Sequence, residues 1–178
     1  MTFTYTRTIR FHETDAAGVV YFANLLTLCH EAYEASLAEA GIALKTFFST
    51  KGGLAVPVVH AEADFYRPLH CGDTIAITLT PTQLTHNSFE IDYKITPQRF
   101  EQGSVEISNP DDLPPDNLPP DDLPPDNLPP GDSNDKPLAT ALTRHVCINP
   151  KTHRRQELTA PLLNWMQAAS TDGTDADD

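Results

Sequence analysis

The chain has 178 residues, which is enough for one domain with a sizeable core, and it carries a formal net charge of -13 at pH 7. Most of that charge lies in residues 111–137 and 171–178, because the rest of the chain contains 13 acidic and 11 basic residues. The acidity disfavours nonspecific binding to nucleic acid or to an anionic membrane, and three cysteines without a CxxC pair indicate neither a disulfide framework nor a zinc site.

The first part of the chain predicts one strand and one long helix. Residues 3–11 alternate apolar and polar side chains, as a strand does, and lack the apolar run of a secretory leader. No window approaches 18 apolar residues, so we expect a cytoplasmic protein without a membrane partner. Apolar residues then recur at helical spacing, and Gly41 is suited to ending this helix. The stripe consists of Phe22, Leu26, Cys29, Tyr33, Leu37 and Ala40.

The remaining chain predicts four strands, over residues 54–66, 73–84, 88–96 and 138–148, and a short helix over residues 159–169. One strand, one apolar helix and four more strands predict an α+β fold, with an antiparallel sheet wrapped around the long helix. A helix this apolar, covered by only one sheet, leaves edges and faces that commonly need a second subunit. We therefore expect a homo-oligomer, either a dimer or a tetramer.

A repetitive segment lies between the last two predicted strands. Residues 109–137 repeat a Leu-Pro-Pro-Asp unit and contain ten of the sixteen prolines. Proline removes amide donors, and the aspartates repel one another, so we interpret this segment as a disordered surface spacer, with a proline-recognition ligand as the alternative. The expected organisation is a single domain over residues 1–169 with this insertion, followed by a disordered acidic tail over residues 170–178.

One acidic residue stands out in "HETDAAGVVYFANLL", residues 12–26. Asp15 lies in a short loop between the first strand and the start of the long helix. A capping or loop aspartate worth ~1 kcal/mol is one interpretation, but six residues separate Asp15 from Phe22, which is too far for a cap. The small residues after Asp15, up to Gly18, are suited to letting a ligand approach the backbone. No metal-binding or nucleotide-binding motif accompanies it, so we expect no metal.

The stretch "HETDAAGVVYFANLLTLCHEAYEASLAEAG" resembles the opening of hot-dog-fold acyl-CoA thioesterases of the 4-hydroxybenzoyl-CoA thioesterase type. The shared pattern is an acid, two small residues and glycine, an apolar pair, two aromatics, and then asparagine. A looser resemblance continues over most of residues 3–97 and 138–165. It implies the hot-dog fold, an acyl-CoA substrate, and no cofactor, since coenzyme A is part of the substrate.

The resemblance also implies the roles of two groups. Asp15 would attack the thioester carbonyl or activate water against it, and the sequence leaves both routes open. The backbone amide of Phe22 would polarise that carbonyl, because amides at a helix start are preorganised donors where oxyanion charge develops.

Within this family the motif is most similar to enzymes that hydrolyse 1,4-dihydroxy-2-naphthoyl-CoA in phylloquinone (vitamin K1) biosynthesis. A 4-hydroxybenzoyl-CoA or short-chain thioesterase is the alternative, although the relatives tied to the Tol-Pal system usually carry histidine where Phe22 stands. A hot-dog protein that binds acyl-CoA without hydrolysing it is an alternative of another class.

Further residues are expected to contact the substrate. The acyl group would meet Gly18, Val19, Tyr21, Asn24 and, from strand residues 58–60 of another subunit, His60. The CoA phosphates need cations, for which the candidates are Arg67, Arg144, Lys151, Arg154 and Arg155. A solvated basic turn is the other interpretation of the last four.

Overall fold

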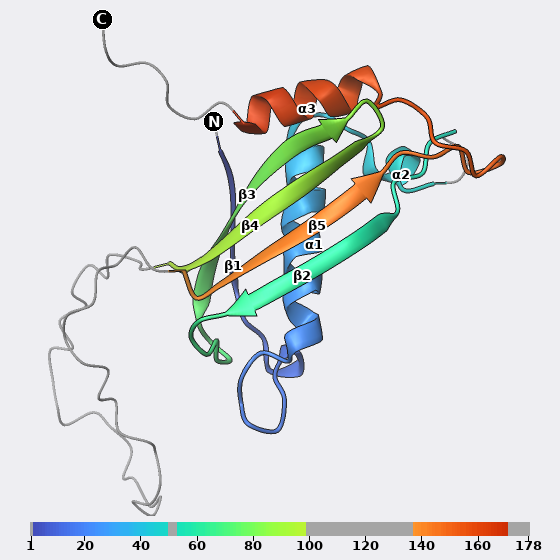
Figure 1. The fold of residues 1–178 in the computed structure, drawn as a ribbon. Helices are drawn as coiled ribbons and strands as arrows, with labels where there is room; N and C mark the ends of the chain where they lie inside the picture. The colour runs from blue at the N-terminus through green and yellow to red at the C-terminus, as the bar shows by residue number, and fades with distance from the viewer. Residues whose placement is uncertain (1, 50–52, 99–136, 171–178) are drawn as a thin grey trace, which may run out of the picture. The chain divides into compact units, whose positions relative to one another are not determined.

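A computed structural model describes residues 2–49, 53–98 and 137–170, which Figure 1 draws in colour. The strands are β1 (Phe3–Thr8), β2 (Val58–Phe65), β3 (Thr74–Thr85), β4 (Ser88–Pro97) and β5 (Ala139–Val146). The helices are α1 (Phe22–Glu39), α2 (Leu44–Phe47) and α3 (Ala160–Ser170), and a 3-10 turn, η1, spans Phe11–Glu13. All five predicted strands and both predicted helices are confirmed, whereas α2 and η1 were not predicted.

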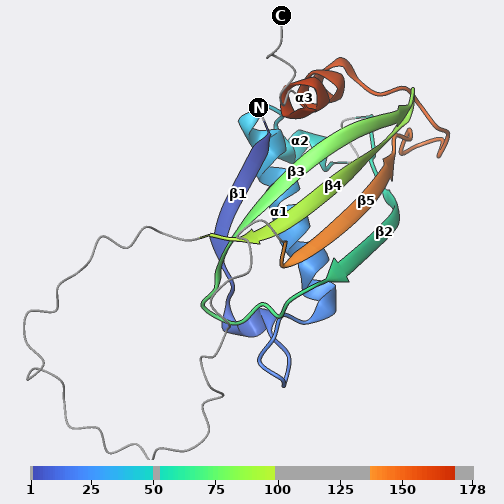
Figure 2. The same cartoon turned by 60° about the vertical axis from the view of Figure 1, so that its left-hand side comes forward.

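The strands form one antiparallel sheet in the order β1-β3-β4-β5-β2, so that β1 and β2 are its edges. Helix α1 lies along one face of this sheet in both views (Figures 1 and 2). The α+β arrangement expected from the sequence is therefore confirmed. Strand β4 pairs directly with β5, and the proline-rich segment lies between them in sequence. Residues 109–136 and 171–178 fall outside the described residues, and their disorder stays a prediction.

The core lies between α1 and the inner face of the sheet. Alternate residues of the central strands, such as Ile77 of β3 and Ile91 of β4, point to this side and are fully buried. Each buried side chain of this size contributes about 1.5–3 kcal/mol to folding. Helix α3 closes one end of the core, where the Trp165 indole N–H donates to Ser36 Oγ of α1 at 3.2 Å.

The buried face of α1 differs from the predicted stripe at its two ends. Phe22 is 65% exposed and Ala40 is also exposed. The buried residues are instead Leu25, Leu28, Cys29, Ala32, Tyr33, Ser36 and Leu37. The reason is that Phe22 lies in the first turn, where it lines a pocket instead of the core. The predicted stop is confirmed, because Gly41 has a φ of 78° and Ile42 N–H bonds to the Leu37 carbonyl.

No helix in the described ranges is both long and apolar enough to cross a bilayer. The three cysteines are free thiols, and burial raises the pKa of Cys29 to about 12 and that of Cys147 to about 11. These two thiols therefore stay protonated and unreactive near neutral pH.

His145 is buried in the core beside aromatic rings. It is 1% exposed, its ring stacks on Phe89 with centroids 4.8 Å apart, and its Nε2 lies 2.9 Å from Thr143 Oγ1. Burial lowers the pKa of His145 from 6.5 to about 4. The neutral imidazole is thus the form that the folded protein accommodates.

We expect this histidine to make the protein sensitive to acid. As pH falls below 6.5, the unfolded chain takes up the proton first, so stability decreases until about pH 4. The loss should approach about 3 kcal/mol, at 1.36 kcal/mol per pKa unit. Urea unfolding at a series of pH values measures it, and His145→Gln should remove this component of the slope. An unchanged slope in His145→Gln would contradict the assignment.

Candidate active site

The loop that carries Asp15 is a tight reversal of the chain. Asp15 N–H donates to the Val19 carbonyl at 2.8 Å, and Gly18 N–H donates to the Asp15 carbonyl at 3.0 Å. Gly18 has a φ of 77°, a left-handed conformation that costs other residues ~1 kcal/mol. Val20 N–H then bonds to the Leu69 carbonyl at 2.8 Å. The loop is therefore held against the segment between β2 and β3.

The Asp15 side chain is exposed and does not cap α1. The N-cap residue is Tyr21, and no side chain bonds there, so the capping interpretation is wrong, whereas the interpretation as a loop aspartate agrees with the structure. Asp15 Oδ1 instead accepts the Ala17 N–H at 2.8 Å, which closes the loop locally. In the described part of the chain, Oδ2 has no hydrogen-bond partner. One carboxylate oxygen thus holds the loop, and the other is available to a ligand.

The start of α1 presents two unpaired backbone donors. Tyr21 N–H bonds to the Glu13 carbonyl at 2.9 Å, and Asn24 N–H bonds to the Tyr21 carbonyl at 2.8 Å. Between them, Phe22 N–H and Ala23 N–H have no acceptor among residues 2–49, 53–98 and 137–170. They lie at the positive end of an 18-residue helix, which favours negative charge.

A pocket of about 430 Å³ joins the Asp15 loop to this helix start. Its lining is mainly apolar and aromatic, and the Tyr21 and Phe22 ring centroids are 4.6 Å apart. The lining residues are Asp15, Val19, Val20, Tyr21, Phe22, Phe65, Tyr66, Arg67, Pro68 and Leu69. An acidic residue, the first residue of a helix and exposed aromatic rings therefore line one concave place, and an apolar lining with a few polar groups is typical of small-molecule sites.

One wall of this pocket was not predicted from the sequence, apart from Arg67. Residues 65–69 follow β2 and contribute two aromatic side chains, of which Tyr66 is 59% exposed. The signal was present as "FYRPL", an aromatic pair before a proline turn, but only the fold brings it to Asp15.

The structure brings together only some of the predicted substrate contacts. Val19 and Tyr21 line the pocket, as does Arg67. Gly18 forms the turn of the loop instead. Asn24 uses its Nδ2 to donate to the Glu13 carbonyl at 2.9 Å.

His60 and the basic turn lie away from Asp15 within one chain. His60 is near the start of β2, where its Nε2 is 3.2 Å from Glu62 Oε2, whereas the pocket is beyond the end of β2 at Phe65. The five residue steps of strand from His60 to Phe65 span roughly 17 Å. The turn that holds Lys151, Arg154 and Arg155 follows β5 at that same distant end. Arg144 donates to Glu90 Oε2 at 2.9 Å.

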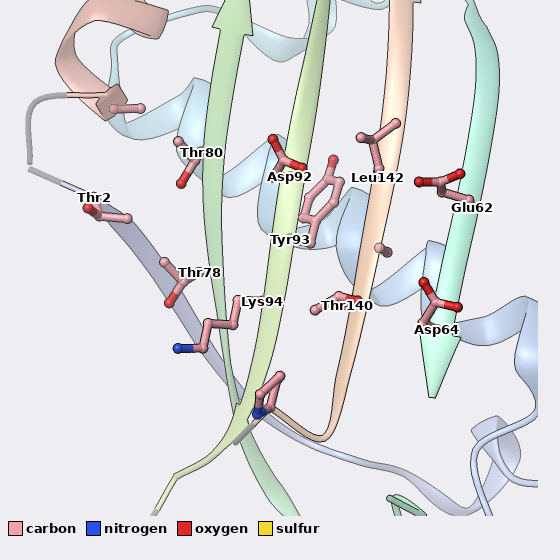
Figure 3. Close-up of a pocket in the computed structure, with 13 residues that line it drawn as sticks. Thr2, Glu62, Asp64, Thr78, Thr80, Asp92, Tyr93, Lys94, Thr140 and Leu142 are labelled. Carbon is pink, nitrogen blue, oxygen red and sulfur yellow. The ribbon is translucent and has the colours of Figure 1, made fainter. Parts of the chain in front are cut away.

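A larger hollow, of about 640 Å³, lies on the outer face of the sheet (Figure 3). Its lining includes the carboxylates of Glu62, Asp64 and Asp92. Partial burial raises the pKa of Asp92, and the neighbouring Glu90 and Glu62 raise it further. Three carboxylates against the one cation of Lys94 repel phosphate, and none of the described helices begins among the residues that line this hollow, so the smaller pocket is the candidate site.

Among the described residues, no group of three or more histidine, cysteine or acidic side chains is arranged to hold a metal ion.

Comparisons with known proteins agree with one another. Residues 9–169 match the family described as the thioesterase-like superfamily. Over 169 residues, the chain is 45% identical to the 1,4-dihydroxy-2-naphthoyl-CoA hydrolase of Crocosphaera subtropica, covering 95% of this chain and 98% of that protein. The hydrolase of the same name from Synechococcus elongatus is 39% identical, with 92% and 93% covered. The crystal structure of a 1,4-dihydroxy-2-naphthoyl-CoA thioesterase from Synechocystis superposes with a TM-score of 0.70 at 31% identity, covering 97% of this chain and 100% of that one.

Proposed function

The chain belongs to the thioesterase-like superfamily and has its hot-dog fold, and on that premise we propose that it hydrolyses 1,4-dihydroxy-2-naphthoyl-CoA. The products are 1,4-dihydroxy-2-naphthoate and coenzyme A, as a step of phylloquinone biosynthesis. Relatives with this substrate in their names align over nearly the whole chain. The observation that carries the proposal is that Asp15 and Phe22 line one apolar pocket, at a helix start where the N–H groups of Phe22 and its neighbour Ala23 have no acceptor among the described residues.

The geometry supports a role for each group in hydrolysis. The thioester carbonyl oxygen binds at the free N–H groups of Phe22 and Ala23, which stabilise the negative charge that develops as the carbonyl is attacked. Asp15 acts on the carbonyl carbon, either directly or through a water molecule. If Asp15 activates water, that water adds to the carbonyl and the carbon–sulfur bond then breaks; if Asp15 attacks directly, the carbon–sulfur bond breaks to give a mixed anhydride, which water hydrolyses. In both routes the coenzyme A thiolate takes up a proton.

The pocket lining supports an aromatic acyl group. Tyr21, Phe22, Phe65 and Tyr66 place four rings around the cavity. Aromatic rings pack best against other rings in offset or edge arrangements, and a fused two-ring acyl group offers more such surface than a short aliphatic chain.

A second copy of the chain completes the site in this proposal. Strand β2 is an edge strand with exposed apolar side chains, including Val59 at 56% and Phe65 at 42%. Such an edge offers unpaired backbone groups to another strand. Antiparallel pairing of β2 with its own copy around a two-fold axis is the isologous contact that closes a dimer.

In this dimer, residues that lie far from Asp15 within one chain approach the Asp15 of the other chain. Antiparallel pairing centred on β2 sets residue 58 of one chain opposite residue 65 of the other. The partner's His60 and its basic turn, with Lys151, Arg154 and Arg155, then come toward the pocket. These cations supply charge for the coenzyme A phosphates, together with Arg67 of the same chain. Arg144 already forms an ion pair with Glu90, so it is the weakest of these candidates for binding a coenzyme A phosphate.

The Asp15→Asn variant tests the role of Asp15. Asparagine keeps an oxygen that accepts the Ala17 N–H, so the free energy of unfolding should stay within about 0.5 kcal/mol of wild type. The kcat should fall roughly 10³-fold, because the general base or nucleophile is lost. A variant with more than a tenth of wild-type kcat would contradict the proposal, and a wild-type protein that binds but never hydrolyses acyl-CoA would be a binding protein instead.

A panel of CoA thioesters tests the substrate. We expect kcat/KM for 1,4-dihydroxy-2-naphthoyl-CoA to exceed that for 4-hydroxybenzoyl-CoA and butyryl-CoA by about 10²-fold, since the pocket discriminates through buried ring surface. An equal or greater kcat/KM for butyryl-CoA would identify the protein as a short-chain thioesterase.

Mixing two defective variants tests the shared site. Asp15→Asn and the double variant Arg154→Ala/Arg155→Ala should each be impaired as homodimers. After subunit exchange, half of the dimers are mixed and each holds one intact site, so activity should return to roughly a quarter of wild type. If both parts of the site belong to the same chain, no activity returns.

A further inference from the structure

A buried ion pair lies beside the Asp15 loop and outside the pocket lining. The side chains of Arg7 and Glu13 are only 10% and 8% exposed, and Arg7 Nη2 donates to Glu13 Oε1 at 2.5 Å. Arg7 Nη1 also donates to Glu31 Oε2 of α1. One guanidinium therefore joins β1, the turn before the loop, and the long helix through charge-assisted hydrogen bonds.

Glu13 itself holds four groups in place. Its Oε1 accepts from Arg7, and its Oε2 accepts the Arg10 N–H at 2.7 Å, which closes the turn η1. Its peptide carbonyl accepts two more donors, the Tyr21 N–H and Asn24 Nδ2, both at 2.9 Å. The side chain thus fixes the chain before the loop, while the carbonyl fixes the start of α1.

Both halves of the site are attached to this residue. Asp15 follows Glu13 by two positions, and Phe22 follows Tyr21, whose amide is bonded to Glu13. Because the two ends of the loop are tied at Glu13, its position sets how far the carboxylate lies from the helix-start amides. Removing most of an ion pair from water costs free energy, and here every oxygen of Glu13 is hydrogen-bonded.

We propose that Arg7 and Glu13 are positioning residues for thioester hydrolysis, which fix the separation between the Asp15 carboxylate and the amides of Phe22 and Ala23. This inference rests on the proposed function of Asp15. Neither residue lines the pocket, so they act on the geometry of the reacting groups and not on substrate affinity. Asn24, expected from the sequence to contact substrate, belongs to this frame through its bond to the Glu13 carbonyl.

The variants Glu13→Gln, Arg7→Met and Asn24→Ala should therefore lower kcat and leave KM nearly unchanged. A displacement near 1 Å costs up to ~10²-fold in rate, so we expect a loss of about 10-fold to 10²-fold in kcat with KM within about 2-fold. Arg7→Lys retains the charge but not the two-pronged geometry, so it should recover part of the rate. Glu90→Gln is the matched control, since it breaks the exposed Arg144–Glu90 pair and should leave kcat unchanged.

The experiment measures kcat and KM for each variant in the full-length protein, normalised to the folded fraction and taken well below each melting temperature. In the Asp15→Asn background, Glu13→Gln should cause little further loss, because the group it positions is gone. If Glu13→Gln does not fold, the kcat and KM values of Arg7→Lys and Asn24→Ala test the inference instead.

Two results would overturn the inference, and a third would remove Asn24 from it. If these variants keep the wild-type kcat while Asp15→Asn is inactive, the positioning role is wrong but the proposed function is unaffected. A lowered melting temperature with unchanged kcat would assign a purely structural role. A raised KM in Asn24→Ala with unchanged kcat would return Asn24 to substrate contact. Wild-type activity in Asp15→Asn would instead remove the proposed function itself.

Discussion

The first amides of an α-helix have no acceptor within the helix, and the candidate site is built around that constraint. In this chain the Tyr21 N–H bonds to the Glu13 carbonyl, whereas the N–H groups of Phe22 and Ala23 have no acceptor among the described residues, and Phe22 lines a pocket. A carboxylate alone would be an ordinary loop residue, and open amides alone an ordinary helix end. Their meeting in an apolar cavity is what makes attack on a thioester carbonyl chemically reasonable.

The fold explains why the helix start is available. Helix α1 is buried along its middle by the sheet and closed at its C-terminal end by α3, through Trp165 and Ser36. Its first turn extends past the packed core, where Phe22 is exposed to the pocket. The apolar helix thus stabilises the domain through its central turns, while its first turn remains free to bind a ligand.

Much of this architecture could be predicted from the sequence. Alternation and helical periodicity located the strands and α1, and the unusual context of Asp15 identified the loop. The four residues of α2 are too few for periodicity to reveal. The exposure of Phe22 depends on where the sheet ends, and the bond from Asn24 to the Glu13 carbonyl is a tertiary contact. Residue spacing shows neither where the sheet ends nor which distant residues meet in the fold. The pocket wall at Phe65 and Tyr66 was missed for the same reason.

The most direct test of the central claim is the infrared stretching frequency of a carbon-13-labelled thioester carbonyl, measured for 1,4-dihydroxy-2-naphthoyl-CoA bound to the Asp15→Asn protein. Two amide donors at the helix start should polarise the carbonyl and shift the stretch to lower frequency than in water. A frequency equal to that of the free thioester in water would contradict the account, because the carbonyl would not be held by the amides of Phe22 and Ala23.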